Sequence, residues 1–134
     1  MAVLALGASS AGAGMPIKPG AYSGATTQAT VSAGFRSIQF TVRKGKVTLT
    51  TEPTVAFGLC LSTPVFTLDG MPTKKLAKNR SFTFPHTFLG TKFDKIHGRF
   101  ISPNEVEGYA IYHFPAQDLC PEGKAKVNFT AKHK

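Results

Sequence analysis

The side chains best suited to chemistry in this 134-residue chain are its four histidines and seven carboxylates. His86, His97, His113 and His133 show no HxH or HExxH spacing, so the sequence predicts no metal site. One hypothesis is a hydrolase that uses His97 and His113 with nearby acids. We expect structural or surface roles for these histidines, because none lies within a recognisable catalytic motif.

Two of the carboxylates, Glu105 and Glu107, share one face of a predicted strand about 7 Å apart. Glycosidases need two carboxylates that face each other across a sugar, at roughly 5 to 10 Å. These two instead lie beside a turn, on the strand that follows it, and have Arg99 as a basic partner, which favours charge pairing on a solvent face. The chain has no GxSxG, SxxK, GxGxxG or P-loop motif. We therefore predict a protein without catalytic residues or cofactor.

The element that positions these groups is a hairpin in residues 92–114, KFDKIHGRFISPNEVEGYAIYHF. A turn at Ser102-Pro103-Asn104 pairs Phe100 with Val106, Gly98 with Gly108 and Ile96 with Ala110 on an apolar face. The opposite face pairs Arg99 with Glu107 and His97 with Tyr109. The register predicts a candidate binding face formed by Lys95, His97, Arg99, Tyr109 and His113.

The charge balance is the global anomaly of the sequence, with 16 Lys and Arg against 7 acids, a net charge of +9 and a pI near 9.9. Such a chain is drawn to anionic polymers and surfaces. The densest basic run predicts a candidate basic patch of Lys74, Lys75, Lys78 and Arg80. The sequence disfavours nucleic acid as the partner, because the neighbouring Phe82 and Phe84 alternate as core residues do.

Composition and turn spacing predict an all-β fold. Phe occurs 11 times, and Gly, Pro, Asn or Asp recurs every eight to twelve residues. We predict one antiparallel β-sandwich of about 7–9 strands, with a small closed β-barrel as the alternative. Strands are expected at Gly20–Thr26, in a hairpin over residues 35–51, at Phe82 and Phe84, in the hairpin above, and after Gly123.

The predicted last strand alternates Lys124, Lys126, Asn128 and Thr130 with apolar residues, so it is not a disordered basic tail. Residues 74–80 are expected to form a loop. The predicted core consists of the apolar residues that alternate along the strands: Phe35, Ile38 or its neighbours, Phe40, Val42, Val47, Leu49, Phe82, Phe84, Ile96, Phe100, Val106, Ala110, Val127 and Phe129.

Cys60 and Cys120 are the two cysteines of the chain, and neither lies in a CxxC motif. We predict a disulfide between them, as opposed to two separate buried thiols. It would close a loop of about 60 residues and stabilise the fold by roughly 4 kcal/mol.

Residues 1–13 have the small residues of a signal peptidase site, Ala11-Gly12-Ala13, after a short apolar run. We predict a truncated signal peptide at 1–13, followed by a single β-rich domain at 14–134. The alternative is a disordered Ala/Gly-rich N-terminus. The apolar run is too short to cross a bilayer, which requires about 20 residues.

Three places in the chain resemble an uncharacterised family of small secreted β-sandwich proteins common in actinobacteria. They are the start KPGAYSGATTQ, a mid-chain Cys60, and the end Cys120-x-x-Gly123 followed by VNFTAKHK. The chain departs from the family at Phe129, where many members have Trp, and in the hairpin sequence DKIHGRF. The resemblance implies an exported β-sandwich and supplies no catalytic residue.

These observations lead us to predict a secreted or envelope-associated, non-enzymatic domain that binds anionic cell-wall or extracellular polymer. The alternatives are a small-ligand-binding β-barrel, which needs polar groups around a cavity, and the hydrolase described above.

Overall fold

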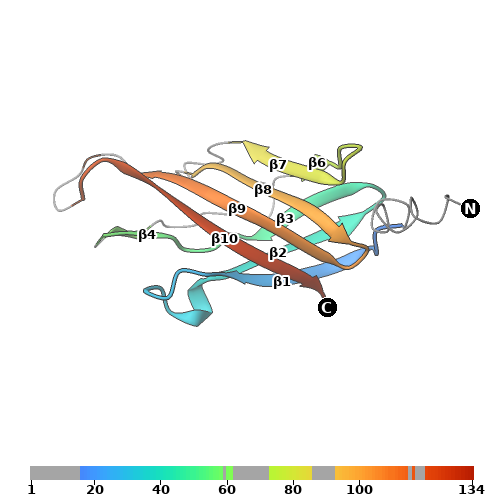
Figure 1. Ribbon diagram of the computed structural model, residues 1–134, viewed down its shortest axis with the longest axis horizontal. Helices are drawn as coiled ribbons and strands as arrows, with labels where there is room; N and C mark the ends of the chain where they lie inside the picture. The colour runs from blue at the N-terminus through green and yellow to red at the C-terminus, as the bar shows by residue number, and fades with distance from the viewer. Residues whose placement is uncertain (1–15, 59, 62–72, 86–92, 115, 117–119) are drawn as a thin grey trace, which may run out of the picture.

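A computed structural model describes residues 16–58, 60–61, 73–85, 93–114, 116 and 120–134. It contains one eight-stranded antiparallel sheet, in the order β6-β3-β2-β1-β10-β9-β8-β7. The edge strands β6 and β7 contact each other, so the sheet is nearly closed like a barrel (Figure 1). The all-β prediction is confirmed, and of the two predicted architectures the structure is closer to the barrel. The main strands are β1 (Gly20–Thr26), β2 (Ser37–Arg43), β3 (Lys46–Thr51), β6 (Thr73–Lys75), β7 (Ser81–Pro85), β8 (Phe93–Ser102), β9 (Glu105–Phe114) and β10 (Gly123–His133).

Three short elements lie outside this sheet. The 3-10 turn η1 (Ala33–Phe35) precedes β2, while β4 (Ala56–Phe57) pairs with β5 (Cys60–Leu61). In Figure 1, η1 and β4 lie toward the end of the barrel away from the C-terminus.

The hairpin of β2 and β3 forms as predicted, because its turn residues accept positive φ. Lys44 has φ 51° and Gly45 has φ 76°, the pattern of a tight turn that matches strand twist. The alternation of β3 changes near its end. Phe40 lies opposite Leu49, and Gln39 lies opposite Thr51, so one extra β3 residue forms a bulge. Beyond the bulge, the side chain of Glu52 points to the interior.

The hairpin of β8 and β9 has the predicted register. Phe100 pairs with Val106, Gly98 with Gly108 and Ile96 with Ala110, while His97 lies opposite Tyr109 and Arg99 opposite Glu107. Gly98 and Gly108 lie where a larger side chain would clash with neighbouring atoms. A Cβ on Gly108 would lie 2.1 Å from the carbonyl oxygen of His97, and one on Gly98 would lie 2.4 Å from the ring of Phe82.

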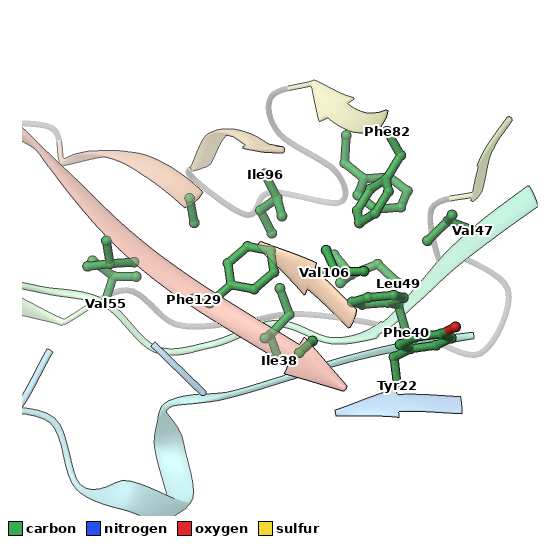
Figure 2. Close-up of a cluster of buried hydrophobic side chains, with 14 of the residues drawn as sticks. Tyr22, Ile38, Phe40, Val47, Leu49, Val55, Phe82, Ile96, Val106 and Phe129 are labelled. Atoms are coloured by element: carbon green, nitrogen blue, oxygen red, sulfur yellow. The ribbon is translucent and has the colours of Figure 1, made fainter. Parts of the chain in front are cut away.

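Aromatic rings fill the interior toward the end of the barrel where β8 joins β9. The Tyr22 ring stacks on the Phe40 ring with their centroids 5.3 Å apart, and the centroids of the Phe40 and Phe82 rings are also 5.3 Å apart. Figure 2 shows side chains from both halves of the sheet, including Tyr22 and Phe129, pointing into one interior. The predicted core residues are buried, apart from Phe35. Residues that the prediction omitted are also buried: Tyr22, Val31, Val55, Tyr112, Phe114 and Ala131.

The prediction for Phe35 is wrong, because its side chain is 66% exposed. The Phe35 amide donates to the Ser32 carbonyl at 2.9 Å, which closes the 3-10 turn before β2 begins at Ser37. Phe35 therefore lies outside the alternation that buries Ile38 and Phe40.

The prediction of a loop at residues 74–80 is also wrong in part. Lys74 and Lys75 belong to the edge strand β6, where Lys74 lies opposite Val47 and Lys75 opposite Lys46. Backbone pairing with β3 stabilises this short strand although its three residues are all exposed.

The predicted disulfide between Cys60 and Cys120 is present, with Cα atoms 5.7 Å apart. It ties β5 to the chain just before β10. None of the helical segments in the described ranges is long and apolar enough to cross a bilayer. The predicted signal peptide at residues 1–13 lies outside the described residues.

Candidate functional site

The outer face of β8, β9 and β10 carries the predicted binding residues. Strand alternation turns Lys95, His97 and Arg99 outward, because Ile96, Gly98 and Phe100 between them are buried. The register places Tyr109 beside His97 on one side and beside Asn128 of β10 on the other.

Tyr109 is the centre of this face. The Nζ atom of Lys126 lies 4.6 Å from the Tyr109 ring centroid, and that of Lys95 lies 5.6 Å from it. Both are cation–π distances. The His97 ring lies 5.3 Å from the Tyr109 ring, centroid to centroid. We call these four residues, Lys95, His97, Tyr109 and Lys126, the Tyr109 cluster.

His97 adds no charge to the Tyr109 cluster at pH 7. Burial lowers its pKa, and the charges of Lys95 and Arg99 lower it further. Its Nδ1 lies 2.8 Å from the hydroxyl oxygen of Thr83 on β7, which fixes the ring. At pH 7 this imidazole can donate or accept a hydrogen bond without adding charge.

The predicted residues Arg99 and His113 lie on the same face, on either side of the Tyr109 cluster. Arg99 is exposed and lies opposite Glu107, but no ion pair within 4.0 Å joins them. The His113 Nε2 lies 3.5 Å from the Glu122 carboxylate. Acidic residues therefore flank the cluster at both ends, and its middle is basic.

The structure does not bring His97 and His113 together. His113 follows Tyr109, the partner of His97, by four residues on one strand, a spacing of about 13 Å. His133 has a structural contact, since its Nε2 lies 2.9 Å from the Pro19 carbonyl oxygen. His86 lies outside the described residues. Within the described ranges, no group of three His, Cys, Asp or Glu side chains is arranged to hold a metal ion.

The candidate basic patch lies on a different part of the barrel. Lys74, Lys75 and Lys78 are exposed on and after β6, which β7 separates from β8. Arg80 is half-buried with φ 67°, and its carbonyl accepts a hydrogen bond from the Phe100 amide at 3.0 Å. Arg80 therefore helps to shape the turn before β7, and the exposed part of the patch consists of the three lysines.

Glu52 is a residue that the sequence analysis did not single out. It is 4% exposed, and the Tyr112 hydroxyl donates a hydrogen bond to its Oε2 at 2.9 Å. Burial raises the pKa of Glu52 to about 7, although the bond from Tyr112 acts to lower it. The alternation of Val47 and Leu49 predicts that Glu52 points outward. The bulge in β3 reverses this, and nothing in the sequence signals the bulge.

No protein-family model, curated protein or solved structure matches this chain. The resemblance to the actinobacterial family therefore stays a prediction.

Proposed function

We propose that this domain is exported and binds an anionic, sugar-containing polymer of the cell envelope on the outer face of β8, β9 and β10, without catalysis. The observation that carries the proposal is the Tyr109 cluster, an aromatic ring flanked by the Lys95 and Lys126 ammonium groups. The ring offers an apolar surface to a sugar, and the two cations can pair with carboxylate or phosphate groups along the polymer.

The arrangement suits an extended polymer. The face lies on strands of ten, ten and eleven residues, the longest in the described structure. Lys126 and Lys124 point outward on β10 at the spacing of alternate residues, about 7 Å. Such a row can contact successive anionic groups, and the net charge of +9 favours encounter at low salt.

Export is the second part of the proposal. An intramolecular disulfide is characteristic of oxidising compartments, and Cys60 and Cys120 form one. The small-residue stretch at 1–13 and the resemblance to secreted actinobacterial proteins agree with export.

Retention of the purified, disulfide-bonded protein on immobilised teichoic acid and on polygalacturonate tests the binding, with neutral dextran as the control. We expect retention on both polyanions at low salt and elution as salt rises. The double variant Lys95→Gln/Lys126→Gln should bind roughly tenfold more weakly. Tyr109→Ala should weaken binding at constant net charge.

The charge-matched control is Lys74→Gln/Lys75→Gln, which removes two cations from the candidate basic patch. We expect it to retain most of the affinity. Equal weakening by the two double variants would show that net charge alone drives binding and would contradict the assigned face. No retention of the wild-type protein at low salt would contradict the proposed function.

A further inference from the structure

A cleft of about 590 Å³ opens between the segment around η1, the end of β3 and β5. It is separate from the Tyr109 cluster, since its walls come from other elements. Its described lining residues include Phe35, Ser37, Glu52 and Leu61.

The walls of the cleft include large apolar side chains that are left in solvent. Phe35 is 66% exposed and Leu61 is 61% exposed. They are two of three large hydrophobic side chains exposed in the described part of the chain, and both line this one cleft. Clustering of exposed apolar groups around a concave surface is characteristic of ligand sites.

Glu52 is the one titratable side chain among the described lining residues. Its Oε2 accepts a hydrogen bond from the Tyr112 hydroxyl, whereas its buried Oε1 has no hydrogen-bond partner among the described residues. Leaving such an acceptor unpaired in a buried site is unfavourable in free energy. A donor that entered the cleft and reached Oε1 would recover that free energy, so the carboxyl is suited to a ligand that carries an N–H group.

We propose that this cleft binds a small organic ammonium, with its apolar body against Phe35 and Leu61 and its N–H group donating to Oε1 of Glu52. The site has one acidic group, an unpaired acceptor atom and apolar walls, which together select a cation with a hydrocarbon body. The inference is independent of polymer binding, because the Tyr109 cluster is basic and would repel the same ligand.

The charged and titratable groups near Glu52 determine how binding depends on pH. Tyr112 packs against it from β9, and burial and the Glu52 charge raise the pKa of Tyr112 well above 10, so it stays neutral. Arg36 lies between the lining residues Phe35 and Ser37 but does not line the cleft. Glu52, with a pKa of about 7, therefore changes charge between pH 5 and pH 8.

NMR titration of the ¹⁵N-labelled protein with n-hexylammonium tests the proposal, with 1-hexanol and hexanoate as ligands of the same length. We expect amide shifts around Phe35 and Leu61 at pH 8, and up to about a hundredfold weaker binding at pH 5, from the fraction of Glu52 ionised at each pH. Hexanol and hexanoate should bind at least tenfold more weakly at pH 8.

Glu52→Gln should lose the preference for the ammonium, and the rim variant Phe35→Ser should weaken binding while leaving the pH dependence unchanged. Glu107→Gln, an exposed carboxyl on the outer face, is the matched control and should bind normally. The proposal is overturned by absence of binding at pH 8, by equal binding of hexanol, or by unchanged ammonium binding in Glu52→Gln. Lys95→Gln/Lys126→Gln should leave the titration unchanged, which separates this site from the proposed polymer surface.

Discussion

Replacement of Glu52 by Gln should make the stability of the domain less dependent on pH. The carboxyl is 4% exposed, and in the described structure no Lys, Arg or His side chain forms an ion pair with it. Its ionised form is therefore disfavoured in the fold, and burial raises its pKa from 4.5 to about 7. Gln has nearly the same shape, and its amide oxygen can still accept the hydroxyl of Tyr112.

The sign and size of the effect follow from linkage. A carboxyl whose pKa is raised in the folded state holds its proton more tightly there than in the unfolded chain. Its contribution to stability is complete below pH 4.5, falls as pH rises through about 7, and is then constant. The interval of 2.5 between these pKa values corresponds to about 3 kcal/mol, of which roughly 2.5 kcal/mol falls between pH 5 and pH 8.

Urea denaturation of the oxidised protein at half-unit steps from pH 5 to pH 8 measures this quantity. The free energy of unfolding of Glu52→Gln minus that of the wild type should rise by about 2–3 kcal/mol across the range. The subtraction removes the contribution of His97, whose lowered pKa is common to both proteins. For the control Glu107→Gln, the free energy of unfolding of the variant minus that of the wild type should stay constant from pH 5 to pH 8. A constant or falling difference for Glu52→Gln would refute the assignment of a buried, uncompensated carboxyl.

Two further predictions concern the disulfide and the close contact of β8 with β9. Cys60→Ala/Cys120→Ala should lose about 4 kcal/mol of stability in urea denaturation, because the bridge closes a loop of about 60 residues; a loss below 1 kcal/mol would contradict this. Gly108→Ala should lower the free energy of unfolding by more than 2 kcal/mol, because its Cβ would lie 2.1 Å from the His97 carbonyl oxygen. Gly34→Ala, where a Cβ meets nothing within 4 Å, is the control and should change stability by less than 1 kcal/mol.

The parts of the fold that depend on neighbouring residues could be predicted from the sequence. The register of β8 and β9 is determined by the turn at residues 102–104 and by the apolar alternation on both sides of it. A shift by one residue would expose Phe100 and Val106 together. For the same reason, the outward positions of His97 and Tyr109 could be predicted before the structure was known.

The strand at Lys74 and Lys75 and the burial of Glu52 were not predicted, because both depend on a partner far away in the chain. Lys74 and Lys75 form a strand because the edge of β3 is available to pair with them. Glu52 turns inward because β3 bulges against β2, and its hydroxyl partner Tyr112 is 60 residues away. The exposure of Phe35 has a local cause instead, because a 3-10 turn, and not a strand, occupies its position.

The sequence by itself determined the all-β class, the β2–β3 and β8–β9 hairpins and the exposed side of the basic last strand, because alternation and turn chemistry act over a few residues. The tertiary structure decided that the sheet curls until β6 meets β7. It also decided that Lys126 of β10 lies over the ring of Tyr109, and that the Glu52 carboxyl is buried beside an apolar cleft. These features arise when strands distant in the sequence are brought together, and local residue patterns do not predict that pairing.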